Sequence, residues 1–331
     1  MEQSRISEIQ LGITAAAIAG DSGSVYRLVA HLLDEGTPFE TVVFDMLLRS
    51  EREVGLRWQA GDYLVTEEHA ATATLETVIA LLTGSLDQPE KESAVVVATT
   101  PGDSHSLPAR AVAAHLLYLG HRTTFLGANV LAPDLREYLE FDPAAAVVLS
   151  GAMTSHLLGA RDAIRASHSA GIPVLVGGRA FGENGIWAER VGADAWVASP
   201  GEVADHLESW APDVHASEAR AKNPGGVLER VMERHNAVLA EAEALLVHAL
   251  GEPPGARQRT ELATALLVTE ASMLVDDPRP LLDFSRWQGH MLDAHGFRSH
   301  LALTTALSEA LEKTVPEASE WIRRVVSHGM D

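Results

Sequence analysis

Residues 93–103 read SAVVVATTPGD, a continuous apolar run that ends in a Pro-Gly-Asp loop. Such a run predicts a strand buried on both faces, as in a parallel sheet. Further short apolar runs follow, each separated from the next by room for one helix, and the last is ADAWVASP at residues 193–200. The alternation β-α-β-α-β-α-β-α-β predicts a doubly wound, flavodoxin-like or Rossmann-like parallel sheet of about five strands.

On both sides of this segment the apolar residues change to helical spacing. Residues 5–85 predict an antiparallel helical bundle in which Gly20 and Gly36 end helices. Residues 211–226 are polar and contain Pro and Gly, which is typical of a linker, and residues 227–331 predict helices again. We therefore expect a helical bundle over 1–88, an α/β domain over 89–210, a linker over 211–226 and a helical domain over 227–331.

The composition excludes several classes of function. The chain has no cysteine, which rules out disulfides, zinc–thiolate sites and thioether-linked cofactors. Its 46 acidic and 25 basic residues give a formal net charge of -21, which repels phosphate backbones, so we expect no direct DNA binding. A signal peptide is not evident and no apolar run is long enough to span a bilayer, so a cytoplasmic protein without membrane contact is expected.

The loop after the first predicted strand carries Asp103-Ser104-His105, the strongest chemical signal. Ligands of doubly wound sheets bind beyond the carboxyl ends of the strands, which places His105 at the ligand crevice. An acid two residues earlier can hydrogen-bond the other ring nitrogen, fix the tautomer and raise the basicity of the imidazole toward a metal. A solvated histidine beside an aspartate that caps the next helix is the alternative.

The segment VATTPGDSHSLPARAVAAHLLYLGHRTTFLGANV, residues 97–130, resembles the cobalamin-binding domain family. The family signature is Asp-x-His-x-x-Gly, then a Ser-x-Leu loop, then Gly-Gly. Asp103 and His105 match its first part, Ser150 its second and Gly177-Gly178 its third. The order and spacing of these three loops make the resemblance specific.

This resemblance extends over about residues 92–208 and implies that His105 ligates the cobalt of cobalamin in place of the cofactor's own base. Two positions depart from the signature: Ala152 stands where leucine is usual, and Pro108 where it has glycine. The second departure leaves the path of the cofactor's nucleotide tail open. The cobalamin-binding residues implied for this domain are Asp103, Ser104, His105, Ser150, Met153, Gly177 and Gly178.

The stretch EREVGLRWQAGDYLVTEEHAATA, residues 51–73, resembles the cap of CarH-type B12-dependent photoreceptors. In that family a Trp-x9-Glu-His motif covers the upper face of adenosylcobalamin, which implies this role for Trp58, Glu68 and His69. Trp58 is predicted to end one helix, and Glu68-His69 lie in the first turn of the next, which Thr66 is expected to begin and cap. A core tryptophan beside a solvated Glu-His pair is the alternative.

Two features differ from the CarH type. We find no helix-turn-helix before the bundle, and Gln59 stands where that family has a histidine that ligates cobalt after illumination. Capture of cobalt by that route is therefore not expected. His69 is a candidate substitute.

The stretch DPRPLLDFSRWQGHMLDAHGFRSHLALTTALSEAL, residues 277–311, resembles globin-like sensor modules. Together with a B12 domain, this order resembles the photocobilins, which implies biliverdin beside adenosylcobalamin. Bilins need cations for their propionates, an acceptor for their pyrrole nitrogens and a flat aromatic neighbour. The candidates are Asp283, Arg286, Trp287, His290, His295 and Arg298. The bilin would be noncovalent; haem on His290 or His248, or an ordinary helix with a core tryptophan, is the alternative.

These resemblances predict a photoreceptor rather than an enzyme, in which light changes cobalt ligation and contacts between domains or with partners. A homo-oligomer or a separate effector protein is left open. The alternative is a corrinoid carrier of a methyltransferase system, whose C-terminal helices oligomerise or bind haem. A carrier must expose cobalt, which fits a tryptophan lid poorly. A B12 mutase is less well supported, because the sequence shows no segment large enough for the catalytic barrel of such an enzyme. An interaction module that has kept the fold without its cofactor is disfavoured by the intact Trp58 and His105.

Overall fold

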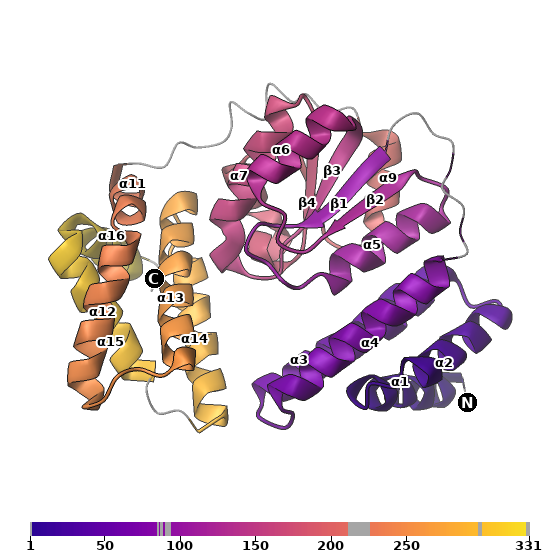
Figure 1. Cartoon of the computed structure of the whole chain (residues 1–331), viewed down its shortest axis with the longest axis horizontal. Helices are drawn as coiled ribbons and strands as arrows, with labels where there is room; N and C mark the ends of the chain where they lie inside the picture. Colours follow the sequence, from indigo (N-terminus) through magenta and orange to yellow (C-terminus); the bar gives the residue numbers. More distant parts are fainter. Residues whose placement is uncertain are drawn as a thin grey trace.

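A computed structural model of the protein describes residues 2–84, 86, 89, 94–210, 226–296 and 300–328. Figure 1 shows N-terminal helices, a central sheet flanked by helices, and a C-terminal group of helices. The predicted fold class, helices before and after a doubly wound α/β domain, is confirmed. That the last group is globin-like stays a prediction. Among the described helices, none is both long and apolar enough to cross a membrane.

The central sheet is parallel and has the order β2-β1-β3-β4-β5. Its strands are β1 (Ala94–Thr99), β2 (Thr123–Gly127), β3 (Ala144–Ser150), β4 (Val174–Gly177) and β5 (Ala195–Val197). The order reverses between β1 and β3, which pair side by side up to Thr99 and Ser150. The crevice beyond these two residues is therefore the switch point of the sheet, where ligands of such folds bind.

Helices cover both faces of this sheet. They are α5 (Leu107–Tyr118), α6 (Ala132–Phe141), α7 (Leu157–Ser169), α8 (Ala188–Val191) and α9 (Glu202–Ser209), with short turns η2 (Thr154–His156), η3 (Arg179–Phe181) and η4 (Glu183–Gly185). Successive residues of β1 enter opposite cores: Val96 packs in one apolar cluster, Val95 and Val97 in another. This alternation on two buried faces explains the continuous apolar run of the strand.

The N-terminal bundle lies against the α/β domain (Figure 1). It consists of α1 (Glu2–Ile18), α2 (Ser22–Asp34), η1 (Thr41–Leu48), α3 (Arg49–Gln59) and α4 (Val65–Thr83). Gly20 and Gly36 have positive φ and follow the ends of α1 and α2, as predicted. The π-helical form of η1 was not predicted, because its apolar residues are spaced in a way that also fits an ordinary helix. Leu107 and Ala111 of α5 complete the core of the bundle.

The predicted cap of α4 is wrong. The helix begins at Val65, so Thr66 already lies inside it, and Leu64 occupies the capping position. The Glu67 carboxylate instead accepts a hydrogen bond of 2.7 Å from the Leu64 amide. An acidic side chain in the first turn thus satisfies the free Leu64 amide. The sequence pattern predicted instead that the Thr66 side chain would cap the helix.

The C-terminal helices are α11 (Gly226–Glu233), α12 (His235–Leu250), α13 (Ala256–Val275), α14 (Arg279–Ala294), α15 (His300–Thr314) and α16 (Pro316–His328). The predicted breaks at 251–255 and 276–280 separate α12, α13 and α14, and the break at 295–296 ends α14. Residues 211–225 of the predicted linker lie outside the described residues, and Gly226 already belongs to α11. Helix α13 packs against α7, α8 and η2, which joins this group to the α/β domain.

Candidate functional site

The loop after β1 holds His105 on a buried aspartate. His105 Nδ1 lies 2.6 Å from Asp103 Oδ1, and the His105 amide donates to the same oxygen at 3.0 Å. The Asp103 side chain is 1% exposed, whereas that of His105 is 48% exposed. With Nδ1 engaged, Nε2 is the nitrogen left to meet a ligand. The predicted Asp–His pair is confirmed, and no side-chain cap bond to α5 is found here.

Asp103 also joins the loops that follow β1 and β3. Its Oδ2 accepts a 2.6 Å hydrogen bond from the Ala152 amide and lies 3.6 Å from His156 Nδ1. Burial alone would raise the pKa of the Asp103 carboxyl, but donors on His105, His156 and Ala152 outweigh it and hold that pKa well below its ordinary value. Asp103 is therefore a fixed negative charge that spans the switch point.

The pKa of His105 is raised, first by its hydrogen bond to Asp103 and further by the charges of Asp103, Glu68 and Glu51, against an opposing effect of burial. A more basic imidazole donates its lone pair more strongly to a metal. The two glutamates belong to α3 and α4. The Ser106 hydroxyl, one residue after His105, donates to Glu76, so α4 lies beside the loop that carries the imidazole.

The end of β4 approaches the loop after β3 so closely that only glycine fits. Gly178 has a φ of +101°, and a Cβ there would lie 2.3 Å from the Gly151 carbonyl oxygen. The Gly151 amide donates to the Gly177 carbonyl at 3.0 Å, which locks the two loops together. Gly177 thus lies beside Ser150 at the ends of their strands, and Gly178 follows directly.

Helices α3 and α4 present a cluster of carboxylates next to His105. The Thr72 hydroxyl lies 2.7 Å from Glu51 Oε1 and 3.4 Å from Glu68 Oε1, and Glu68 Oε2 lies 2.7 Å from His69 Nδ1. Burial raises the pKa of Glu51 to about 7, with the charge of Glu68 adding to the effect and Thr72 opposing it. The Ser106 hydroxyl donates to Glu76 of α4, which ties the His105 loop to the cap.

Comparison with known families agrees with this geometry. Residues 93–207 match a family described as a B12 binding domain, and residues 10–83 match a second family with the same description. The matched regions are cobalamin-binding domains. A search of curated proteins gave no significant match.

Several solved structures resemble the chain. The monomethylamine corrinoid protein of Methanosarcina barkeri has 22% identity and a TM-score of 0.52, and the match covers 62% of this chain and 99% of that one. The methanol:cobalamin methyltransferase complex of the same organism has 18% identity, coverages of 65% and 86%, and a TM-score of 0.35. A cobalamin-binding protein of Desulfitobacterium hafniense DCB-2 has 22% identity and a TM-score of 0.34, and the match covers 61% of this chain and 98% of that one. At such identity the first likeness shows the fold alone.

The residues of the cobalamin-binding α/β domain fit a corrinoid. The oriented imidazole of His105 offers one free nitrogen, and the glycine pair leaves space where a side chain would collide. The Thr100 hydroxyl, at the start of the same loop, is buried without a hydrogen-bond partner in the described part of the chain. Buried polar atoms of this kind are normally paired, so an amide-rich ligand would satisfy it.

Other predicted residues of this domain lie around the same crevice. Ser150 ends β3, and Met153 directly precedes η2. Ser104 is exposed between Asp103 and His105. Pro108 lies in the first turn of α5, where proline is harmless to the helix.

Sequence reasoning missed three residues of the site: Glu51, Asn129 and His156. The Asn129 side-chain oxygen accepts a 2.7 Å hydrogen bond from the Gly102 amide, and the Asn129 backbone amide donates to Thr99 Oγ1 at 2.9 Å. The loop after β2 therefore braces the His105 loop. An asparagine two residues after a strand was an available signal, whereas His156 and Glu51 approach only through the tertiary fold.

Trp58 lies in the last turn of α3, one residue before the helix ends, and it is held by the C-terminal helices. Its carbonyl oxygen lies 2.8 Å from His295 Nε2, and the two ring centroids are 5.9 Å apart. Its half-buried indole packs against the cluster formed by the α/β and C-terminal helices rather than in the core of the bundle. The alternative of a core tryptophan beside a solvated Glu-His pair stays a prediction: Trp58 packs on a core cluster, and the His69 side chain is 73% exposed. Gln59 follows as the last residue of α3.

The structure distributes the candidate bilin residues rather than gathering them. Asp283 and Arg286 form an exposed ion pair of 3.1 Å, and Trp287 packs against Phe284 with ring centroids 5.8 Å apart. His290 is exposed on the same helix, whereas His295 reaches the cap. Arg298 lies outside the described residues, and His248, the haem candidate, is exposed near the end of α12.

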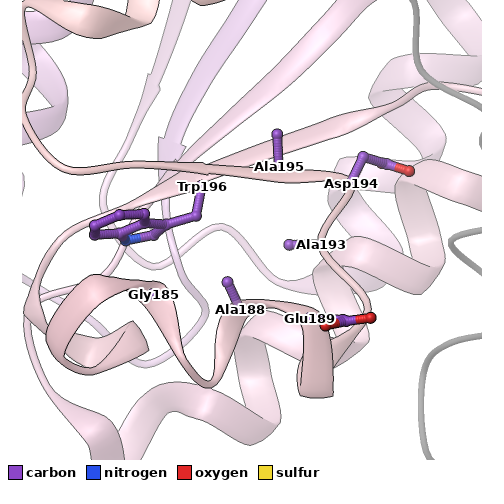
Figure 2. Close-up of a pocket in the computed structure, with 7 residues that line it drawn as sticks. All are labelled: Gly185, Ala188, Glu189, Ala193, Asp194, Ala195 and Trp196. Carbon is purple, nitrogen blue, oxygen red and sulfur yellow. The ribbon is translucent and has the colours of Figure 1, made fainter.

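A shallow pocket of about 350 Å³ opens between α8 and the edge strand β5 (Figure 2). Its lining residues are Gly185, Ala188, Glu189, Ala193, Asp194, Ala195 and Trp196. Asp194 is fixed from within the domain, because it accepts hydrogen bonds from the Val174 amide at 2.7 Å and lies 2.8 Å from His168 Nε2. Strands β3 and β4 separate β5 from β1, so the pocket is distinct from the His105 crevice.

Proposed function

We propose that the protein binds adenosylcobalamin between its N-terminal bundle and its α/β domain and responds to light. The observation that carries this proposal is the position of the cap formed by α3 and α4, which Glu76 ties to the His105 loop through Ser106 and whose Trp58 is held by the C-terminal helices. Adenosylcobalamin, when bound, supplies a cobalt–carbon bond that light cleaves. The rest of the proposal concerns the residues of the chain.

On the lower side, His105 is the proposed cobalt ligand. Asp103 accepts the Nδ1 proton and so directs Nε2 toward the cofactor. Because Asp103 is itself held by the Ala152 amide and His156, the imidazole keeps its orientation without help from the cofactor. Ser104, Ser150, Met153, Gly177 and Gly178 are the proposed contacts of the remaining corrinoid.

On the upper side, Trp58, Glu68 and His69 are proposed to cover the adenosyl group. Glu68 is 18% exposed and His69 73% exposed, so the pair is accessible to a ligand that approaches the cap. Loss of the adenosyl group would remove contacts from this wall and allow the cap to move. His69 is then the proposed new partner of cobalt, since Gln59 cannot replace the histidine of the CarH type.

We further propose that the C-terminal helices hold biliverdin without a covalent bond. The aromatic pair of Phe284 and Trp287 and the neighbouring cation Arg286 on α14 support this assignment. The contact of His295 with Trp58 offers a direct path between such a pigment and the cobalamin site. The output would be a change in contacts between domains or with an effector protein.

A corrinoid carrier for methyl transfer is the second candidate. The fold shared with the monomethylamine corrinoid protein over 99% of that protein favours it more directly than it favours a photoreceptor. A carrier must expose the upper face of cobalt to a partner enzyme. The cap of this chain is tied to α5 through Ser106 and to α14 through His295, which is the observation that favours the light sensor.

The absorption spectrum of the full chain with adenosylcobalamin, in darkness and after green light, tests the proposal. We expect a dark spectrum that is stable for hours, a lasting change on illumination, and weaker binding of methylcobalamin than of adenosylcobalamin. Equal binding of the two cofactors, with a light-exposed spectrum no different from that of the free cofactor, would favour the carrier.

A further inference from the structure

Helix α14 touches the other two domains, one at each end. Its N-terminal end follows the turn that docks on α8: Trp187 Nε1 donates to Asp277 Oδ2 at 3.0 Å, and Arg190 donates to the Val275 carbonyl. The same Asp277 carboxylate accepts hydrogen bonds from Arg279, the first residue of α14. This end of the helix is therefore fixed to the α/β domain that carries His105.

The C-terminal end of α14 meets the end of α3. His295 Nε2 lies 2.8 Å from the Trp58 carbonyl oxygen, and its ring lies beside the indole at a tilt of 44°. The backbones of Gly61 and Ala294 also approach closely here, because a Cβ on Gly61 would lie 2.9 Å from the Ala294 carbonyl oxygen. Gly61 also has a φ of +82°, so the loop that follows Trp58 is shaped for this approach.

Because α14 is fixed at both ends, it sets the distance between the α/β domain and the loop that follows α3. The 16 residues of α14 span about 24 Å at ~1.5 Å per residue. Phe284, Gln288, Met291 and Leu292 are buried along it, so the helix is anchored in the C-terminal core over its whole length. A shift of the α3–α4 loop relative to the α/β domain must therefore break the contact at His295 or move the C-terminal helices.

We infer that His295 is a positioning residue for the upper wall of the cobalamin site: through α14, the C-terminal domain holds Trp58 at its place in the cap. This inference rests on the proposed role of Trp58 at the upper face. It assigns to the C-terminal domain a second role that does not depend on a pigment. The domain selects the upper ligand by fixing the tryptophan that must pack on it.

The experiment compares three variants of the full chain. His295→Ala removes the contact, and His295→Gln keeps an N–H donor that can reach the Trp58 carbonyl. Asp293→Ala changes an exposed side chain in the same last turn and is the matched control. Kd values for adenosylcobalamin and methylcobalamin are measured in darkness, and backbone amide exchange over residues 56–64 is measured in the cofactor-free protein.

For His295→Ala we expect adenosylcobalamin affinity to fall about three- to tenfold, the worth of one hydrogen bond, and methylcobalamin affinity to change less than adenosylcobalamin affinity. Amide exchange over residues 56–64 should rise. His295→Gln should recover most of both effects, and Asp293→Ala should behave as the wild type. Equal weakening of both cofactors, or a glutamine variant no better than alanine, would overturn the inference.

The amide exchange separates this inference from the proposed function. If the wild type shows no preference for adenosylcobalamin, the proposed function fails, and the role of His295 in holding Trp58 is then decided by exchange alone. Unchanged exchange over residues 56–64 in His295→Ala would overturn the positioning role, whatever cofactor the protein prefers.

Discussion

The proposed lower and upper walls of the cobalamin site are built in different ways. On the proposed lower wall, the hydrogen bonds that His105 makes to Asp103, and the one that holds Asp103, come from the α/β domain itself, through the loops after β1 and β3. On the proposed upper wall, Trp58 is held by His295, which lies 237 positions further along the chain in the C-terminal domain. The lower wall is thus preorganised to bind a metal, whereas the upper wall depends on how the domains are arranged.

This difference suggests where a change of cofactor state acts. A group held by buried bonds within one domain keeps its geometry when the ligand changes. A group held across a domain boundary moves when either partner moves. The substitutions below test this division, from the largest expected effect to the smallest.

Replacing the metal ligand should have the largest effect. We expect His105→Ala to lower the affinity for cobalamin at least about 100-fold, since loss of a ligand should exceed the ~10–100-fold cost of losing a partner that orients it. Equilibrium dialysis in darkness measures this change. The control is His31→Ala, an exposed histidine of α2 that is remote from the crevice. Unchanged affinity in His105→Ala would remove His105 from the site.

Asp103→Asn tests the support of that ligand. The amide keeps the shape of the carboxylate but loses its charge, and the affinity for cobalamin should fall by about 10–100-fold. The pKa of His105 should also fall toward its ordinary value, because the Asp103 hydrogen bond is the main cause of its rise. NMR titration of His105 in the cofactor-free protein checks this shift. A pKa equal to that of the wild type would show that Asp103 does not orient the imidazole.

These two predictions concern the part of the site that the sequence predicted well. The loop after β1 is local: Asp103 and His105 are two residues apart, and the strand before them fixes where the loop begins. The fold class followed from the same local signals, since apolar runs on buried strands alternate with helical periodicity. Even the boundaries of the C-terminal helices were marked by Gly and Pro.

The remaining features depended on contacts that no local pattern contains. Glu51 meets Glu68 through the packing of α3 on α4, and His156 meets Asp103 across two strands. His295 was proposed as a pigment ligand from its helix alone, and the structure places it against Trp58. Thr66 is not the cap because α4 already begins at Val65, one residue before it.

The joint between α8 and α14 should respond to acid. Burial would raise the pKa of Asp277, but donation from Arg279 and Trp187 lowers it to about 2. Because the folded-state pKa lies below the ordinary 3.8, this stabilisation is present above pH ~4 and is lost as the pH falls toward ~2.

Asp277→Asn should therefore lower the free energy of unfolding at pH 7 by about 2 kcal/mol, from ~1.4 kcal/mol per pKa unit. It should also flatten the dependence of stability on pH below ~4. Urea unfolding at several pH values measures both effects. Asp293→Asn, a change of an exposed residue of α14, is the control. A variant as stable as the wild type at pH 7 would show that this joint contributes nothing.

On the upper wall, Trp58→Ala should mainly change selectivity. Loss of a packed aromatic should lower the preference for adenosylcobalamin over methylcobalamin by up to about tenfold, the upper range for aromatic contacts. Dark titrations of both cofactors give the ratio. Phe141→Ala, in which an 88% exposed aromatic is removed, should leave it unchanged. A ratio unaffected by Trp58→Ala would contradict the cap.

The smallest expected effect is the coupling between a bilin and the cobalamin. Biliverdin should bind to the full chain and be released completely by denaturation, since the chain has no cysteine. Coupling between two sites is reciprocal, and we expect adenosylcobalamin to change biliverdin affinity about fivefold or less, by the same factor as the reverse effect. Titration with haem as competitor checks the pigment. A preference for haem over biliverdin would contradict this prediction and favour a haem-binding role for the C-terminal helices.

The ligation of cobalt by His105 is tested most directly by electron paramagnetic resonance of the reduced, paramagnetic Co(II) cofactor bound to the full chain. Protein labelled with nitrogen-15 at histidine is compared with unlabelled protein. If His105 is the ligand, the nitrogen splitting of the cobalt signal changes from a triplet to a doublet on labelling, and this doublet is lost in labelled His105→Ala. A triplet that persists in the labelled protein would mean that the cofactor's own base remains on cobalt, and would contradict the account.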